Sequence, residues 1–553
     1  MNDYNNIREV VLYSRANFSN RPAFFLRNKT GYDKISYEKF TTDILKLGAS
    51  LIDRGYSGGK HIAMIGENSY QWLVTALAVC SSGNILVPVD KELPEDDILN
   101  VVKSSDSEMM LFANSYSDVI ERVKSELSLE VIIFDKPTSK LTEISTQALI
   151  EGYTSEDYLD KCCSVPIVND NMSCIVYTSG TTGMSKGVML SHTNLISDVK
   201  CCFELAEVGD CKFSLLPMHH TYEFVLGTLF FMANGSANAI NNSIKYISQN
   251  LKIFSPTDLV IVPLIAETLH NSIWNNIRNS GKEKLVKRMI TVTAFLMKFG
   301  IDIRKKVFKE VHAALGGRVI NIFCGGAPID PDIARSYVDF GFNFNIGYGI
   351  TECSPLISGN CDQNRKKMDS CGRPGSCNEV KIDNPDEKGE GEIMAKGTNV
   401  MLGYYKNPEA TAAVMRDGWF GTGDIGRFDK QGMLYVTGRV KNLIVLKNGK
   451  NIYPEELELL MYRIDLVKEA VVYSLEGENG EETAIAVEIY PDMEKVENNN
   501  ITEYKKVIEE EIDKINSSLP YYKRIAYIGY RDNEFEKTTT KKIKRDKING
   551  KQK

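Results

Sequence analysis

The sequence predicts an α/β protein with a large N-terminal domain of several subdomains, whose mostly parallel sheets are flanked by helices, and a small α+β C-terminal domain. The chain has 553 residues, which is too long for one ordinary core. Between residues 62 and 348, short apolar runs alternate with segments of helical period, as in consecutive βαβ units. The pattern shifts to shorter strands after residue 438. We therefore expect two domains, residues 1–440 and 441–553.

Composition and charge exclude several classes of protein. Hydrophobic residues make up 43% of the chain and charged residues 25%, as in an ordinary globular protein. The formal net charge of −7 favours no nucleic acid partner. The first 25 residues lack a signal pattern, and no apolar run is long enough for a transmembrane segment, so we expect a cytoplasmic protein. Peripheral membrane contact is left open. The twelve cysteines are scattered, which favours reduced thiols.

Two predicted strands, residues 174–177 and 187–190, enclose a loop rich in glycine and hydroxyl residues. The second strand leads into a helix with Ser191 or Thr193 as its N-cap. Its apolar residues recur at the helical period: Leu195, Val199, Cys202, Phe203 and Ala206. The loop is therefore pinned between ordered elements.

Further predicted strands lie at residues 259–262 and 319–323, and the second ends in Gly325-Gly326-Ala327-Pro328 before a helix from about Asp330. Strand ends that open onto glycine turns are where α/β sheets bind ligands. Beyond the expected boundary, the predicted elements are strands 442–447 and 470–474 and helices 454–463 and 503–518.

The loop from Tyr177 to Gly187 reads Tyr-Thr-Ser-Gly-Thr-Thr-Gly-Met-Ser-Lys-Gly. Its glycines let backbone N–H groups approach a polyphosphate, its hydroxyls donate to phosphate oxygens, and its lysine supplies positive charge. The spacing is not that of a Walker loop. The alternative is a flexible linker, but linkers rarely join two short apolar strands. We interpret the loop as a phosphate-binding site.

This loop and the sequence that follows it, through Ser191-His192-Thr193-Asn194-Leu195, closely resemble the phosphate-loop signature of the adenylate-forming (AMP-binding) superfamily. Further motifs stand in family order: Leu216-Pro217-Met218-His219-His220, Gly325-Gly326-Ala327-Pro328, Gly347-Tyr348-Gly349-Ile350-Thr351-Glu352, Gly421-Thr422-Gly423-Asp424 and Gly438-Arg439-Val440-Lys441. The resemblance spans about residues 20 to 545 and is greatest to bacterial medium- and long-chain fatty acid–CoA ligases.

The resemblance implies roles for these positions. Tyr348 would stack on the adenine of ATP, Thr351 would touch the α-phosphate, and Glu352 would hold Mg²⁺ together with Thr178. Asp424 would accept hydrogen bonds from the ribose hydroxyls. The implied nucleotide-binding residues are Thr178, Ser179, Gly180, Thr181, Thr182, Gly183, Lys186, Gly325, Gly326, Ala327, Tyr348, Gly349, Asp424 and Arg439. Residues 421–426 also match a dinucleotide Gly-x-Gly-x-x-Gly pattern, but without a βαβ context we reject a nicotinamide site.

His219 and His220 are adjacent, and two neighbouring histidines raise the question of a metal. Adjacent side chains seldom share one ion, and no third ligand is near in the sequence. In the family register His220 lies beside the acyl and carboxylate site; a core or helix-cap histidine is the alternative. The helix expected at residues 222–232 either lines an acyl pocket or belongs to the core.

The basic segment 537–545 resembles the family's catalytic-lysine motif and places Lys542 on that lysine. Its ammonium group would bridge the carboxylate and the α-phosphate in the transition state. Lys541 stands where the family usually has glycine, so the resemblance leaves open which lysine acts. A solvated basic tail is the alternative interpretation.

The resemblance implies a ligase that uses ATP and Mg²⁺ to convert a carboxylic acid to an acyl-adenylate and then transfers the acyl group to coenzyme A. The acid expected is a medium- or long-chain fatty acid. The C-terminal domain would be mobile and would rotate about Lys441 between the two steps. Two alternatives remain: a ligase that loads an acyl carrier protein, and a nucleotide-binding relative that has lost catalysis.

Overall fold

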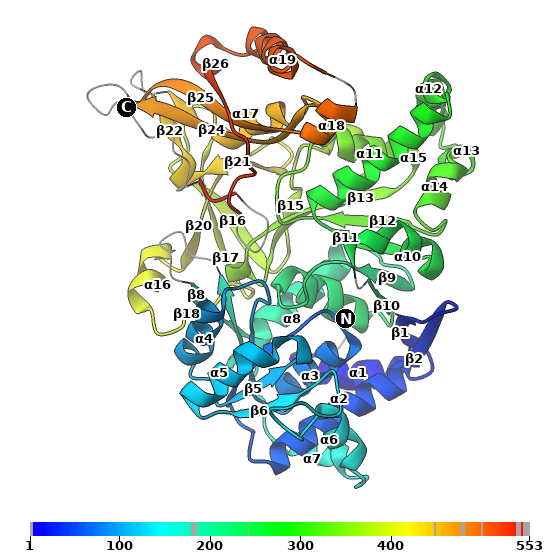
Figure 1. Ribbon diagram of the computed structural model, residues 1–553, viewed down its shortest axis with the longest axis vertical. Helices are drawn as coiled ribbons and strands as arrows, with labels where there is room; N and C mark the ends of the chain where they lie inside the picture. Colours follow the sequence, from blue (N-terminus) through cyan, green and yellow to red (C-terminus); the bar gives the residue numbers. More distant parts are fainter. Residues whose placement is uncertain are drawn as a thin grey trace. The chain divides into compact units, whose positions relative to one another are not determined.

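The structure is a computed structural model that describes residues 4–178, 185–241, 243–446, 450–476, 482–498, 501–537 and 543–545 (Figure 1). The chain divides into two compact units. The first unit consists of Met1–Val380, Ala395–Phe420 and Gly432–Leu434, and the second consists of Lys381–Met394, Gly421–Gln431 and Tyr435–Lys553. The predicted α/β class is confirmed in the sheets of the first unit.

A nine-stranded sheet has the order β15-β14-β13-β12-β11-β9-β10-β1-β2. The six strands from β13 to β1 are parallel, and the strands at both edges are antiparallel. The strands are β1 (Pro22–Arg27), β2 (Tyr32–Ser36), β9 (Cys211–Ser214), β10 (Ala237–Ile240), β11 (Asp258–Ile261), β12 (Asn321–Cys324), β13 (Asn343–Gly349), β14 (Leu356–Asn360) and β15 (Arg373–Pro374). The predicted strands 259–262 and 319–323 correspond to β11 and β12.

A seven-stranded sheet has the order β18-β8-β7-β4-β3-β5-β6. Its strands are parallel from β7 to β6, whereas β8 and β18 are antiparallel to their neighbours. The strands are β3 (His61–Ile65), β4 (Ile85–Pro88), β5 (Met109–Phe112), β6 (Glu130–Ile133), β7 (Met172–Thr178), β8 (Lys186–Ser191) and β18 (Gly403–Tyr404). The predicted strand, loop and strand at residues 174–190 therefore form a β-hairpin.

Helices cover these sheets, and residues of both sheets belong to one large apolar core. Phe24 and Val260 of the first sheet and Ile62 and Cys174 of the second belong to one cluster of buried residues. The helices of the first unit are α1 (Ile7–Phe18), α2 (Tyr37–Asp53), α3 (Tyr70–Ser81), α4 (Glu95–Ser104), α5 (Ser117–Leu127), α6 (Thr146–Gly152), α7 (Tyr158–Ser164), α8 (His192–Leu205), α9 (Phe231–Ala233), α10 (Ile247–Phe254), α11 (Pro263–Asn279), α12 (Glu283–Met297), α13 (Arg304–Val307), α14 (Lys309–Ala314), α15 (Pro331–Phe340) and α16 (Pro408–Val414).

Two helices show how local sequence shapes this unit. Ser191 caps α8 in a reciprocal capping box with Asn194, which decides between the two predicted caps. The helix predicted at residues 222–232 is a π-helix over Tyr222–Phe230, named η2, that runs into α9. The absence of a side chain at Gly227 makes room for a buried carboxylate, because a Cβ there would lie 2.6 Å from Glu223 Oε2.

The second unit has its own apolar cluster, which includes Leu457, Val487 and Ile512. Its sheets are the three-stranded β24-β25-β26 and the two-stranded β22-β23. These elements are β22 (Ile444–Val445), β23 (Asn451–Ile452), β24 (Val467–Glu476), β25 (Glu482–Pro491), β26 (Ile525–Tyr530), α17 (Pro454–Met461), α18 (Met493–Asn498) and α19 (Tyr504–Ser518). The predicted strand 442–447 is thus reduced to two residues, and position 447 lies outside the described residues.

The remaining strands form a five-stranded sheet of order β16-β17-β20-β19, with β21 paired to β20. They are β16 (Asn378–Asp383), β17 (Gly391–Gly397), β19 (Met415–Arg416), β20 (Trp419–Phe428) and β21 (Leu434–Arg439).

Candidate active site

The predicted phosphate loop joins β7 to β8. Thr178 ends β7 and pairs with Lys186, which begins β8. Ser179, Gly180, Thr181, Thr182 and Gly183 lie outside the described residues. The Lys186 ammonium lies 4.9 Å from the centre of the Tyr404 ring. Tyr404 belongs to β18, which pairs with β8, so the hairpin itself holds this cation against the ring.

Thr351 and Glu352 lie in a short 3-10 helix, η4 (Thr351–Cys353), just after β13. The Tyr404 hydroxyl donates to Glu352 Oε1 at 2.9 Å, and the Met401 N–H donates to the Glu352 carbonyl at 2.8 Å. Burial and the Glu352 carboxylate raise the pKa of Tyr404, so its hydroxyl stays protonated and remains a donor. Tyr404 therefore links the lysine of one sheet to the carboxylate that follows the other.

The two glycine motifs lie at the carboxyl ends of two inner strands of the nine-stranded sheet. Gly325 follows β12 and Tyr348 lies near the end of β13, and these strands are parallel neighbours. Gly326 has a φ of +85°, a conformation that favours glycine. A Cβ on Gly349 would lie 1.9 Å from the Pro355 carbonyl oxygen, so no larger residue fits. Ala327 is exposed beside Gly326, so these strand ends keep accessible backbone for a ligand.

The His219–His220 pair precedes η2, and its rings lie 4.2 Å apart. His219 is buried, and its Nε2 lies 3.4 Å from Asp90 Oδ1. Nδ1 or Nε2 of each histidine and a carboxylate oxygen of Asp90 all lie within 4.8 Å of one another. No sequence pattern points to Asp90, because the contact joins a residue just after β4 to one far along the chain. His220 is half-buried, as an accessible site residue would be.

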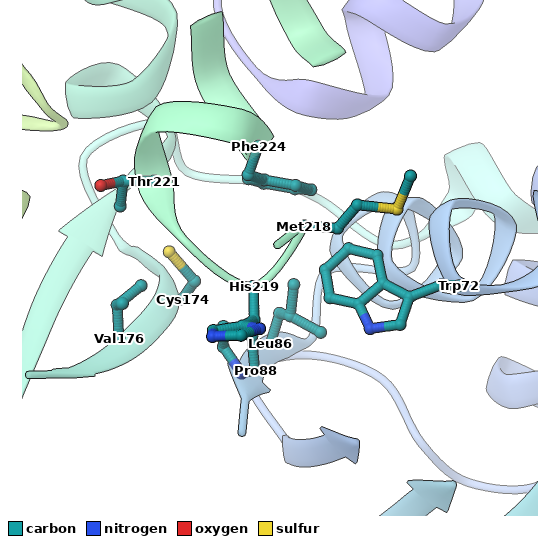
Figure 2. A pocket seen from close by; sticks show the side chains of 9 residues that line it. All are labelled: Trp72, Leu86, Pro88, Cys174, Val176, Met218, His219, Thr221 and Phe224. Atoms are coloured by element: carbon teal, nitrogen blue, oxygen red, sulfur yellow. The ribbon is translucent and has the colours of Figure 1, made fainter. Parts of the chain in front are cut away.

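A narrow apolar cavity lies beside His219 (Figure 2). It is lined by Trp72, Leu86, Pro88, Cys174, Val176, Met218, His219, Thr221 and Phe224. These residues come from α3, β4, β7 and the segment that enters η2. The volume of the cavity is about 10 Å³, which has room for about one water molecule.

A buried ion pair holds η2 in place. Lys212 of β9 pairs with Glu223, both side chains are fully buried, and Ser214 also donates to the Glu223 carboxylate. Burial lowers the pKa of Lys212 and raises that of Glu223. The pair fixes the helix directly after His220. Sequence reasoning missed it, because an isolated lysine and an isolated glutamate carry no signal of pairing.

In the second unit, Arg439 Nε lies 2.7 Å from Asp424 Oδ1. Asp424 is 5% exposed and Arg439 is 40% exposed. Asp424 sits in β20 and Arg439 ends β21, the strand paired with it. Lys441 follows in an exposed 3-10 turn. Lys541 and Lys542 lie outside the described residues.

Comparison with solved structures identifies the fold class. O-succinylbenzoate CoA synthetase from Bacillus subtilis, solved with an acyl-adenylate, matches with a TM-score of 0.75 over 98% of each chain at 19% identity. The model of the AMP-binding enzyme family matches residues 13–405, and that of the AMP-binding enzyme C-terminal domain matches residues 441–551. The chain belongs to the AMP-binding enzyme family.

Two relatives have similar sequence identities to this chain. Long-chain-fatty-acid–CoA ligase 5 of Rattus norvegicus is 29% identical over 503 residues, covering 84% of this chain and 72% of the relative. The chloroplastic long-chain-fatty-acid–[acyl-carrier-protein] ligase AEE15 of Arabidopsis thaliana is 27% identical over 519 residues, covering 79% of this chain and 70% of the relative. In the described part of the chain, every helix is too short or too polar to cross a bilayer.

Proposed function

We propose that this protein is a fatty acid–CoA ligase, which activates a medium- or long-chain fatty acid with ATP and transfers the acyl group to coenzyme A. The chain is an adenylate-forming acid–thiol ligase. The observation that carries the proposal is the link through Tyr404, which brings the phosphate-loop lysine Lys186 and the carboxylate of Glu352 to one ring. The Lys186 ammonium is suited to bind phosphate, and the Glu352 carboxylate is suited to bind a divalent cation.

In the proposed first step, a carboxylate oxygen of the acid attacks the α-phosphorus of ATP, and pyrophosphate leaves. Thr351 contacts the α-phosphate and Tyr348 stacks on the adenine. The phosphate-loop residues from Thr178 to Lys186 hold the leaving pyrophosphate. The Glu352 carboxylate and the Thr178 hydroxyl are oxygen ligands of the kind that Mg²⁺ prefers, and Mg²⁺ held there supplies charge that stabilises pyrophosphate.

The remaining predicted residues have separate roles in this proposal. Asp424 accepts hydrogen bonds from the ribose hydroxyls, and Arg439 orients Asp424 through their ion pair. Lys542 stabilises the charge that develops on the acid and the α-phosphate. His220 orients the acid carboxylate. The exposed turn at Gly326 and Ala327 leaves room for the nucleotide.

Acid-dependent pyrophosphate release with Mg-ATP tests the first step, with acids from acetate to palmitate and with aryl and amino acids. We expect a maximum among medium or long fatty acids and sustained turnover only with coenzyme A. Lys542→Ala should abolish release, and Lys541→Ala is the matched control that decides which lysine acts. ATP binding without release for any acid would instead identify a relative that has lost catalysis.

An acyl carrier protein is the second candidate acceptor, because one relative carries that activity in its name. The same assay with coenzyme A or with a phosphopantetheine-bearing carrier protein separates the two candidates. Faster turnover with the carrier protein would show that the carrier protein, and not coenzyme A, is the preferred acceptor.

We further propose that the apolar side chains around the cavity beside His219 receive part of the acyl chain by moving apart, since the cavity itself has room for about one water molecule. Val176 lines the cavity, whereas its neighbour Ile175 points to the opposite face of the sheet and joins another cluster. Val176→Phe should therefore shift the preferred acid towards shorter chains. Ile175→Phe adds a similar bulk on the other face of the sheet and should leave the preference unchanged. Equal profiles for both variants would place the acyl chain elsewhere.

The domain boundary at residue 440 and the hinge at Lys441 are also proposals. Lys441 lies in an exposed turn, where a change of backbone angles meets little resistance. Lys441→Pro restricts φ there. We expect it to slow transfer to the thiol while acyl-adenylate formation in a single turnover continues. Equal slowing of both steps would contradict a hinge.

A further inference from the structure

Helix α12 has two apolar sides, only one of which packs against the core. It packs against α11 and α15 in the first unit (Figure 1). Its inner side is formed by Val286, Met289 and Ile290. These residues pack against an apolar cluster that includes residues of the nine-stranded sheet. On another side the exposed fractions are 57% for Leu285, 46% for Val292, 57% for Phe295 and 67% for Phe299. Burial in the fold therefore accounts for only one of the two apolar sides.

The exposed residues form a continuous stripe. Leu285, Val292 and Phe295 follow at spacings of seven and three residues, which places them on one side of α12, and Phe299 lies in the turn just after the helix. The rings of Phe295 and Phe299 lie 5.2 Å apart. Ile301 extends the apolar surface beyond the end of the helix and is 49% exposed. Single exposed apolar residues are ordinary, but a contiguous group of this kind marks an interaction surface.

The segment that contains α12 has a net charge opposite in sign to that of the whole protein. Residues 282–309 contain nine lysines and arginines and two acidic residues, a formal net charge of +7 in a chain whose total is −7. Lys284, Arg288 and Lys298 are exposed near the stripe. We call residues 282–309 the α12 surface. Apolar side chains flanked by basic ones are typical of a helix that lies at a lipid interface.

We propose that the α12 surface binds an anionic lipid bilayer. Phe295, Phe299 and their apolar neighbours enter between the headgroups, while the surrounding lysines and arginines contact lipid phosphates. This inference does not depend on which acid or thiol the enzyme uses.

The charge of the α12 surface distinguishes a bilayer from other occupants. A second copy of the chain, docked through the same surface, would bring one +7 segment against another, and like charges repel. A nucleic acid would match the charge, but it offers no apolar phase for the phenylalanine rings. An anionic bilayer satisfies both features.

Flotation of the full-length protein with lipid vesicles tests the proposal, without ATP or fatty acid. Vesicles of phosphatidylcholine alone are compared with vesicles that also contain phosphatidylglycerol. Phe295→Ser combined with Phe299→Ser should weaken binding to the anionic vesicles roughly tenfold or more. Lys284→Glu should weaken it roughly fivefold or more, and this difference should shrink at high salt.

Matched controls lie elsewhere in the first unit. Val168 is 57% exposed, as Phe295 is, and Lys29 is an exposed lysine outside the α12 surface. Val168→Ser and Lys29→Glu should bind as the unaltered protein does. Thermal melts should show that all variants are folded, because every altered side chain is exposed. No vesicle binding by the unaltered protein, or equal binding by the α12 and control variants, would overturn the proposal. So would a dimer that the α12 variants dissociate in the absence of lipid.

Discussion

Two ion pairs in this protein differ in burial, and the difference separates a structural role from a binding role. Lys212 and Glu223 in the first unit are both completely buried. In the second unit Asp424 is almost buried, but its partner Arg439 is 40% exposed. The first pair touches no solvent and anchors a π-helix. In the second pair, part of Arg439 is accessible to solvent. A ligand can therefore approach the pair and form hydrogen bonds with Asp424.

The comparison is tested most strongly by breaking the buried pair. Glu223→Ala leaves the Lys212 ammonium without its partner in an apolar core. We expect the free energy of unfolding to fall by about 3–5 kcal/mol, measured by denaturant titration. Lys212→Met combined with Glu223→Leu removes both charges and should restore most of that loss. Similar losses in the single and double variants would contradict a penalty caused by the unpaired charge.

A buried neutral histidine provides the second test. The Ile7 N–H donates to His192 Nδ1 at 3.4 Å, and burial lowers the pKa of His192 to about 4. The unfolded chain binds a proton below a pH of about 6.5, whereas the folded chain does not until about pH 4. Stability is therefore lost as the pH falls between these values, by about 3 kcal/mol for this group. His192→Asn should flatten the pH dependence of unfolding, and an unchanged slope would contradict this assignment.

The half-exposed pair should affect binding more than stability. Asp424→Ala removes the proposed acceptor of the ribose hydroxyls, and a hydrogen bond to a charged group contributes about 1.5–3 kcal/mol. We expect the KM for ATP to rise roughly tenfold to hundredfold, with little change in melting temperature. Asp429→Ala, in the turn after β20, is the control and should leave the KM unchanged. A large fall in melting temperature for Asp424→Ala would indicate a structural role like that of Glu223.

An exposed pair completes the series. Arg318 and Asp210 are 50% and 66% exposed. Arg318→Ala should lower the free energy of unfolding by less than about 1 kcal/mol, since water screens the pair. A thermal melt beside the Glu223→Ala variant checks this. A comparable loss in both would show that burial does not set the energetic order.

The sequence predicted the regular elements where local signals were strong. Short apolar runs located β7, β11 and β12, and a cap at Ser191 or Thr193 located α8, because hydrophobic period and capping are local properties. It predicted a helix at residues 222–232 but neither its π-helical geometry nor the pairing of its Glu223 with Lys212 of a distant strand. In the described part of the strand expected at residues 442–447, only Ile444 and Val445 pair with β23.

The candidate site was predictable as a set of motifs but not as a network. Glu352 and Lys186 each stood out in the sequence, whereas Tyr404, which contacts both, did not. Asp90 was missed for the same reason. Pairing across two sheets leaves no periodic trace in the chain, so only the structure could identify these partners.

The +7 charge of the α12 surface has a practical consequence for purification. A segment of +7 in a chain of −7 leaves −14 on all the other residues. Ion-exchange resins bind local patches of charge as well as responding to the net charge of a protein. At neutral pH this protein should therefore be retained by a cation exchanger despite a sequence pI of about 5.7.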